Sequence, residues 1–167
     1  MHFKDIKPSE LQFNPFTATA KQWMLITSGD ENGYNTMTAS WGGFGTMFAK
    51  DVVEVVVRPS RHTYGFMEKH KYFTVSFYSE EYRSALKFCG ARSGRDVDKA
   101  KETGLTPVFL DGTTAFEEAS LIFVCKTLYA HDLVPECFRD EETHQFYGST
   151  DYHRAYLAEV VKVYQQS

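Results

Sequence analysis

A series of short runs rich in β-branched and aromatic residues, separated by turn-forming residues, constrains the fold most. Residues 52–57, Val-Val-Glu-Val-Val-Val, favour a β-strand because β-branched side chains crowd the run and signals for helix ends are absent. A turn rich in Gly, Asp and Asn at 29–33 separates two further runs and predicts a hairpin. The predicted strands cover residues 23–28, 35–40, 52–57, 72–77, 119–132 and 157–164.

The predicted helices are short and do not alternate regularly with the strands. Ser79 followed by acidic residues predicts an N-cap and a helix that runs to about Cys89 and stops at Gly90. Asp96 is the predicted cap of a second helix, which Gly104 closes. The predicted helical segments are 62–70, 79–89, 97–102 and one turn within 134–138, and residues 1–20 are expected to be mostly irregular. This pattern predicts a mainly β fold, a β-barrel with short helices, rather than a parallel α/β fold.

Length and composition fit one domain spanning residues 1–167. The chain has 167 residues, enough to bury a sizeable core, and no linker, repeat or low-complexity segment divides it. Aromatic residues make up 16% of the chain, which favours a β-rich core or a large subunit interface.

Charge and hydropathy argue against several classes of partner. A net charge of −4 disfavours nucleic acid and anionic membranes. No apolar run approaches the roughly 20 residues of a membrane span. Residues 1–7 lack the apolar segment of a signal peptide, so a cytoplasmic location is expected. The three cysteines have no metal-site spacing, so no metal is predicted, and Cys89 is expected to be a packing residue.

Two segments rich in small hydroxyl and amide side chains flank the strand at 52–57. The first, residues 35–43, ends in Trp-Gly-Gly, where small residues let the backbone approach a ring and Trp41 offers a wall. The second, residues 58–64, is bracketed by arginines, and its anion-binding donors are Arg58, Ser60, Arg61 and Thr63. The pair suits a flat aromatic cofactor that carries a phosphate.

A third segment adds Ser93 and Arg95 to the donors, whereas the common nucleotide motifs are absent. The chain has no Walker loop, and its glycines lack the Gly-x-Gly-x-x-Gly spacing of a dinucleotide fold. Taken singly, each arginine is equally compatible with a solvated ion pair. Residues 38–41 are likewise compatible with an ordinary strand that places Trp41 in the core.

Three motifs in order resemble the flavin reductase-like family, and its flavoredoxin-type members in particular. They are Asn-Thr-Met-Thr-Ala-Ser-Trp at 35–41, Val-Arg-Pro-Ser-Arg-His-Thr at 57–63, and Cys-Gly-Ala-Arg-Ser-Gly-Arg-Asp-Val-Asp-Lys at 89–99. The resemblance extends over nearly the whole chain. It implies an FMN-binding split β-barrel that forms a homodimer and holds the flavin at the subunit interface.

The resemblance also implies which residues bind the flavin, with the Asn35 amide facing the ring. Tyr152 and Tyr147 are candidates to cover the flavin, and the histidines expected at or near the pocket are His62, His131, His144 and His153. No residue is expected to be catalytic, because the flavin carries the chemistry. The predicted cofactor-binding residues are Asn35, Thr36, Met37, Thr38, Ala39, Ser40, Trp41, Arg58, Ser60, Arg61, His62, Thr63, Ser93, Gly94, Arg95 and Tyr152.

The expected activity is that of an FMN-binding flavin oxidoreductase. It would pass electrons from NAD(P)H through FMN to free flavin, to a redox partner protein or to another small-molecule acceptor. Two alternatives stay open: a flavoredoxin-like electron carrier without efficient NAD(P)H turnover, and a flavin-binding protein without an enzymatic cycle. The sequence leaves the acceptor and the preferred nicotinamide undetermined.

Overall fold

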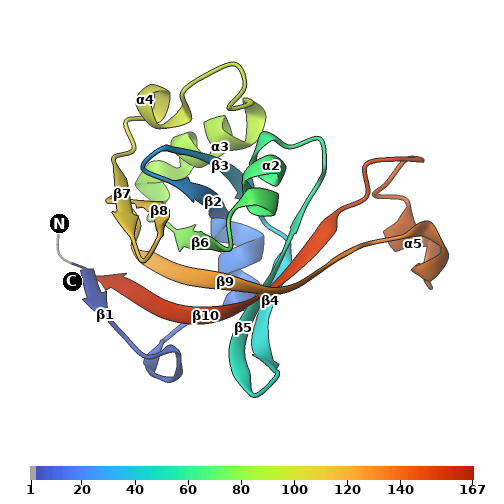
Figure 1. Cartoon of the computed structure of the whole chain (residues 1–167), viewed down its shortest axis with the longest axis horizontal. Coiled ribbons are helices and arrows are strands. Elements are labelled where there is room, and N and C mark those ends of the chain that lie inside the picture. Colours follow the sequence, from blue (N-terminus) through green and yellow to red (C-terminus); the bar gives the residue numbers. More distant parts are fainter. Residues whose placement is uncertain (1–2) are drawn as a thin grey trace.

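A curved antiparallel sheet organises the molecule, and the computed structural model describes it over residues 3–167 (Figure 1). Its strands are β1 (Phe3–Asp5), β2 (Met24–Asp30), β3 (Gly33–Ala39), β4 (Gly42–Met47), β5 (Lys50–Val57), β6 (Tyr72–Phe77), β9 (Leu121–Asp132) and β10 (Arg154–Gln166). They lie in the order β3-β2-β6-β9-β10-β5-β4, with β1 also paired to β10. A separate hairpin consists of β7 (Pro107–Leu110) and β8 (Thr113–Phe116).

The sheet curls into a barrel that is split between its two edge strands. β3 and β4 are consecutive in the chain, yet they lie at opposite ends of the strand order. Only Ser40 and Trp41 connect them, so the two edges come within a short length of chain at this corner. A Cβ at Gly42 would overlap the backbone oxygen of Glu54, so the close approach of β4 to β5 requires glycine here.

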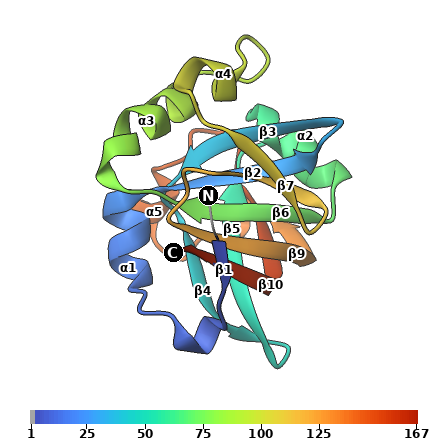
Figure 2. The ribbon, with the colours of Figure 1, turned by 90° about the vertical axis from the view of Figure 1, so that its left-hand side faces the viewer.

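Short helices cover one end of the barrel and one side of it. They are η1 (Pro8–Glu10), α1 (Pro15–Thr17), η2 (Ala18–Gln22), α2 (His62–Lys69), η3 (Glu80–Tyr82), α3 (Arg83–Ala91), α4 (Lys99–Thr103), η4 (Pro135–Cys137) and α5 (Glu141–His144). α3 and α4 lie above the barrel, whereas α1 runs along its side (Figure 2). Residues 133–153, between β9 and β10, form an arm that carries α5 away from the barrel (Figure 1).

Alternation along the strands divides the buried side chains between two cores. Ile26 of β2 packs inside the barrel with Val55 and Phe123, whereas its neighbour Leu25 packs beneath α3 with Leu86. Successive side chains of a strand point to opposite faces, so one apolar strand supplies both cores. The two cores together hold the barrel against its helical cover. This packing fixes the positions of the ends of β3 and β5.

The mainly β fold is confirmed, and each predicted strand has a counterpart, but some local predictions were wrong. Residues 3–20 are not mostly irregular, because β1 pairs with β10 and α1 and η2 begin there; Met1 and His2 lie outside the described residues. β4 was not predicted, because three glycines in six residues hide its pairing with β5. The hairpin of β7 and β8 and the helix α5 were also missed.

Helix boundaries near the third motif differ from the prediction. Asp98 caps α4, accepting from the Lys101 backbone N–H at 3.1 Å, so Asp96 is not the cap. α3 continues through Gly90 to Ala91. Ser79 occupies the N-cap position of η3, but its hydroxyl donates to Glu81 and makes no capping hydrogen bond. The predicted stop at Gly104 is confirmed, with a left-handed φ of 73°.

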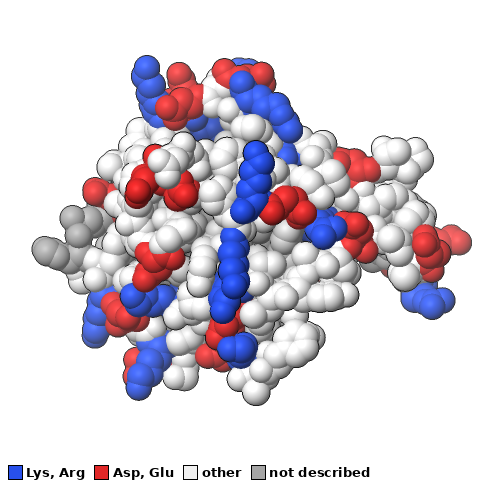
Figure 3. Space-filling model, in the orientation of Figure 1, with Lys and Arg blue, Asp and Glu red and all other residues white. Residues whose placement is uncertain are grey.

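Basic and acidic side chains are interspersed over the face of the molecule in Figure 3, without one large patch of a single sign. Within residues 3–167, no helix combines the length and the apolar character that crossing a membrane requires. Over the same residues, no group of three or more His, Cys, Asp or Glu side chains is arranged to hold a metal ion.

Candidate functional site

A hollow of about 350 Å³ lies at the split of the barrel. The end of β3, the end of β5 and the arm meet there. The lining residues are Met37, Thr38, Ala39, Ser40, Trp41, Val56, Arg58, Arg61 and His153. Ligand sites for small molecules are usually concavities of about 300–1,000 Å³ with a few polar groups, and this one falls within that range.

Trp41 is a wall of this hollow rather than a core residue. It stands at the corner between β3 and β4 and is 42% exposed. Its ring packs edge-on against the Phe146 ring, with ring centroids 5.2 Å apart, and the His153 ring centroid is 5.3 Å away. The alternative in which Trp41 is part of the core is therefore wrong.

Arg61 brings one guanidinium to the hollow from the N-terminal end of α2. Its two terminal nitrogens each donate to the Gly90 carbonyl at 3.2 Å, which ties α2 to α3. A guanidinium has five N–H donors, so others remain for a ligand in the hollow. Burial lowers the pKa of Arg61 from its ordinary value, yet arginine stays charged at any physiological pH.

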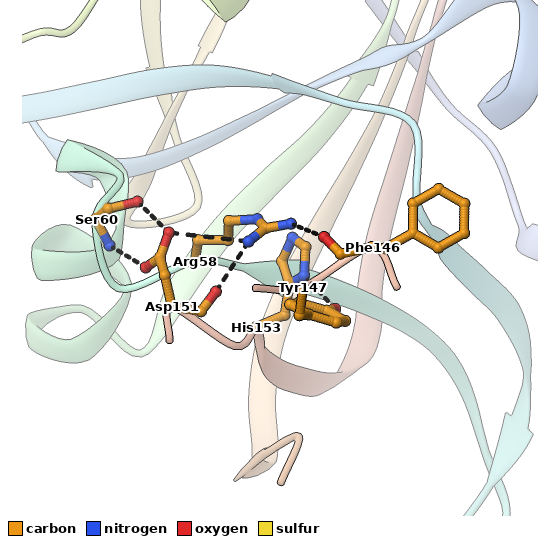
Figure 4. A network of polar contacts seen from close by, with 6 residues as sticks. All are labelled: Arg58, Ser60, Phe146, Tyr147, Asp151 and His153. Carbon is orange, nitrogen blue, oxygen red and sulfur yellow. Dashed lines mark hydrogen bonds and ion pairs between the residues drawn. The ribbon is translucent and has the colours of Figure 1, made fainter. Parts of the chain in front are cut away.

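Arg58 brings a second guanidinium, which the arm holds (Figure 4). It donates to the carbonyls of Phe146 and Asp151, both at 3.1 Å, and lies over the Tyr147 ring at 4.8 Å. The Asp151 carboxylate accepts from the Ser60 backbone N–H at 3.0 Å and from the Ser60 hydroxyl at 2.7 Å. Every group that holds Arg58 belongs to the arm.

His153 supplies a neutral imidazole to the same hollow. Burial, and secondarily the Arg58 charge, lower the pKa of His153 to about 4. The His153 Nδ1 and the Tyr147 hydroxyl are hydrogen-bonded at 2.5 Å. Because Tyr147 engages Nδ1, Nε2 is the ring nitrogen of His153 left for a ligand, as donor or acceptor according to the tautomer.

A second hollow, of about 510 Å³, lies along the first half of β3, between residues 31–36 and residues 94–100. Asn35 borders it but is only 6% exposed, and its amide donates to the Thr63 hydroxyl at 2.7 Å. A Cβ at Gly94 would overlap the Asn35 amide oxygen, so glycine lets the third motif pack directly on β3. Asn35 thus joins β3, α2 and the third motif.

Lys99 is a buried cation beside this second hollow. Its ammonium group donates to the carbonyls of Thr36 at 2.7 Å and Cys89 at 2.8 Å. No carboxylate within residues 3–167 pairs with it. Burial lowers the pKa of Lys99 to about 8, and burial raises the pKa of the Cys89 thiol to about 11. Lys99 therefore clamps β3 to α3, and Cys89 is a protonated packing residue at neutral pH.

The structure distributes the predicted residues over both hollows. The first hollow holds Met37, Thr38, Ala39, Ser40, Trp41, Arg58 and Arg61, and the second holds Asn35, Thr36, Gly94 and Arg95. Neither hollow is lined by Ser60, His62, Thr63, Ser93 or Tyr152. Their roles as cofactor ligands stay predictions.

The predicted residues outside the hollows have protein partners of their own. Ser60 binds Asp151, and the Ser93 hydroxyl accepts from the Arg95 backbone N–H at 3.2 Å. Tyr152 stacks on Tyr147 with ring centroids 4.8 Å apart and lies within the arm.

Sequence reasoning missed three residues of the site, which are Lys99, Asp151 and Phe146. Lys99 closes the third motif, but a lysine in a short helix carries no signal that it will be buried. His153 was expected to border the pocket, and the fold brings it to Trp41 in the first hollow. Asp151 and Phe146 reach Arg58 through the arm, whose path has no counterpart in local sequence patterns.

The chain belongs to the flavin reductase like domain family, whose model matches residues 16–167. The family match and the split barrel agree with the three motifs in the sequence. A comparison with curated proteins found no match.

Solved structures share the fold at low sequence identity. A flavoredoxin from Methanosarcina acetivorans superposes with a TM-score of 0.70 at 17% identity, over 87% of this chain and 69% of that one. An FMN-binding domain of a flavin reductases-like enzyme from Shewanella baltica OS155 has a TM-score of 0.71 at 15% identity, over 98% of this chain and 77% of that one. An NADH:FAD oxidoreductase from Streptomyces globisporus C-1027 has a TM-score of 0.64 at 16% identity, over 87% of this chain and 75% of that one.

The residues of the first hollow fit a phosphorylated flavin. The backbone from Met37 to Ala39 and the Trp41 ring give a flat, weakly polar wall of the kind that suits an aromatic ring system. Arg61 and Arg58 place two positive charges at the rim, where a phosphate group would be bound.

Proposed function

We propose that the protein is an FMN-dependent flavin oxidoreductase that accepts electrons from NAD(P)H and passes them to free flavin or another acceptor. The observation that carries this proposal is the first hollow, in which the end of β3 and Trp41 face two guanidinium groups at the split of the barrel. Membership of the flavin reductase like domain family supports it.

In this proposal the chain binds and orients the cofactor. The ring lies along the backbone of Met37 to Ala39, and Trp41 limits its position and excludes water from one side. Arg61 binds the phosphate through N–H groups that Gly90 leaves unused. The His153 ring, which lines the hollow, contacts the ligand there. Bound FMN supplies the chemistry, because it accepts a hydride and releases electrons singly or in pairs.

Steady-state oxidation of NADH and of NADPH, with and without added FMN, tests the proposal. We expect oxidation of at least one nicotinamide, at a rate that rises with added FMN until the site is saturated. Flavin binding without nicotinamide oxidation would instead favour the electron-carrier alternative. Absence of flavin binding would contradict the proposal altogether.

We further propose that two copies associate through the β4 side of the barrel and complete the flavin site there. β4 is an edge strand, and its turn exposes Met47 and Phe48. Trp41 at its start and Phe146 on the arm are exposed as well. Exposed apolar side chains gathered at an unpaired strand edge are characteristic of an interface.

Light scattering at micromolar concentration tests this assembly. We expect twice the mass of one chain, and Phe48→Ser should shift the mass towards that of the monomer because it removes an exposed apolar contact. Phe109→Ser, which removes an exposed phenylalanine from the distant β7, is the matched control and should leave the dimer intact. A monomeric mass for the parent protein with FMN bound would contradict the proposal.

A further inference from the structure

Three anion donors at the end of β5 converge on one side chain of the arm. The Ser60 backbone N–H and the Ser60 hydroxyl bind the two oxygens of the Asp151 carboxylate, at 3.0 and 2.7 Å. The Arg58 guanidinium lies 4.0 Å from the same carboxylate (Figure 4). A backbone N–H, a hydroxyl and a guanidinium form the kind of donor set that binds phosphate.

The backbone of Asp151 shows that this contact is held against a conformational preference. Its φ is +61°, in the left-handed region that favours Gly and that Asn and Asp adopt more often than other residues. The side chain is partly exposed, so no core packing imposes this conformation. The contacts with Ser60 and Arg58 compensate for the cost of this backbone conformation.

The contact matters for flavin binding because each N–H or O–H donates one good hydrogen bond at a time. While Asp151 occupies the donors of Ser60, a phosphate group cannot use them. Its negative charge beside Arg58 also repels a phosphate dianion. Of the cationic and hydroxyl groups at residues 58–61, only Arg61 then remains for the phosphate, since its guanidinium binds Gly90 and not the arm.

We infer that Asp151 competes with the flavin phosphate for Ser60 and Arg58 and so reduces the preference of the protein for FMN over riboflavin. This inference rests on the proposed function, and it addresses whether the flavin is a resident cofactor or an exchangeable substrate. With the phosphate held by Arg61 alone, ring contacts dominate the affinity, and the flavin exchanges readily.

The rest of the arm stays anchored when the carboxylate leaves. The rings of Phe146 and His153 contact the Trp41 ring of the barrel, with ring centroids 5.2 and 5.3 Å apart. Within the arm, the Tyr147 and Tyr152 rings stack on each other. Displacement of Asp151 therefore requires movement of the tip at residues 148–151 and not of the whole arm.

Affinities for FMN and riboflavin, measured by fluorescence titration on the same variants, test the inference. Asp151→Asn keeps a residue that tolerates positive φ and removes only the charge, whereas Asp151→Gly removes the competing group entirely. Glu142→Gln removes one charge from an exposed side chain of the same arm and is the matched control. Riboflavin reports every effect that does not depend on the phosphate.

We expect the ratio of FMN affinity to riboflavin affinity to rise about fivefold in Asp151→Asn and about tenfold in Asp151→Gly, since charge-assisted hydrogen bonds become available. The ratio in Glu142→Gln should match the parent. A ratio unchanged within about twofold in both Asp151 variants, or a lower one, would overturn the inference while leaving flavin binding established.

Titration with inorganic phosphate, followed by calorimetry, gives a readout that needs no flavin. Asp151→Gly should bind phosphate more tightly than the parent and than Glu142→Gln. If the parent bound neither flavin, the proposed function would fail, and the phosphate titration would still decide whether Asp151 blocks an anion site. Equal phosphate affinity in all three proteins would overturn the inference that Asp151 blocks an anion site.

Discussion

The turn at residues 58–61 and the segment at residues 93–99 both contain arginine and serine but have different tasks. Both were predicted to bind phosphate. In the second segment, Lys99 donates to two fixed carbonyls and Gly94 packs on Asn35. In the first, Arg58 and Ser60 bind groups of the arm.

The difference teaches which cationic donors can serve a ligand. Lys99 is a buried donor bound by carbonyls of β3 and α3, and it is part of the structure because its release leaves those acceptors unpaired. Arg61 also donates to a carbonyl of α3, but it lines the first hollow and has further N–H groups. A donor bound by a partly exposed carboxylate can exchange that partner for a phosphate at little cost. By this reasoning residues 93–99 support the site, and residues 58–61 are the part that a ligand contacts.

The largest expected effect is the loss of stability when Lys99 is removed. Lys99→Met leaves the carbonyls of Thr36 and Cys89 without their donor, which should cost about 2–4 kcal/mol for two buried acceptors. Urea unfolding measures this change. Lys101→Met, on the exposed face of the same helix, should change the stability by under about 0.5 kcal/mol. Equal losses in the two variants would show that residues 93–99 are not a structural clamp.

Next in size is the loss of flavin affinity when Arg61 is removed. Arg61→Ala should weaken FMN binding by about 1.5–3 kcal/mol, because a charge-assisted contact with the phosphate is lost. Arg95, which donates to the Ser60 carbonyl at 3.1 Å and borders the second hollow, should contribute less. Arg92→Ala removes an exposed guanidinium nearby and is the control. If Arg95→Ala weakened binding more than Arg61→Ala, the roles of the two segments would be reversed.

A smaller effect is the pH dependence that His153 gives to the free energy of unfolding. Its pKa is about 4 in the folded protein and about 6.5 when unfolded, so unfolding takes up a proton between these values. The free energy of unfolding should therefore fall as the pH is lowered from about 6.5 to 4. In His153→Gln this slope should decrease, whereas His131→Gln, at an exposed position of β9, should retain it. An undiminished slope in His153→Gln would show that the imidazole is not shielded at the hollow.

The smallest expected effect concerns Cys89, which lies beside the Lys99 clamp. Burial keeps the thiol protonated, with a pKa of about 11, so it is a poor nucleophile at neutral pH. Cys89→Ser should keep FMN bound and leave NAD(P)H oxidation within about tenfold of the parent. If NAD(P)H oxidation fell by several orders of magnitude with flavin still bound, the Cys89 thiol would take part in electron transfer.

Local sequence patterns predicted most of the fold because the strands that matter are strongly β-branched. The run at 52–57 forms the last six residues of β5, and the predicted strand at 157–164 lies within β10. β4 escaped prediction because Gly42, Gly43 and Gly45 give no apolar alternation, and pairing with β5 alone defines it. Tertiary contacts, not propensity, decide such a strand.

The candidate site was predictable only in part. Trp41 and its small neighbours could be proposed because an unusual cluster of small residues ends in Trp-Gly-Gly. The exact partners of Arg58 could not, because they come from the arm about 90 residues later in the chain. The buried state of Lys99 was equally hidden, since its two acceptors belong to β3 and α3.

Equilibrium dialysis of the parent protein against FMN tests the central claim, that the split of the barrel is a flavin site, most directly. The account predicts saturable binding that approaches one FMN per chain, weakened in Arg61→Ala and unaffected in Arg92→Ala. Binding that never saturates, or saturable binding that Arg61→Ala and Arg92→Ala leave equally strong, would contradict it.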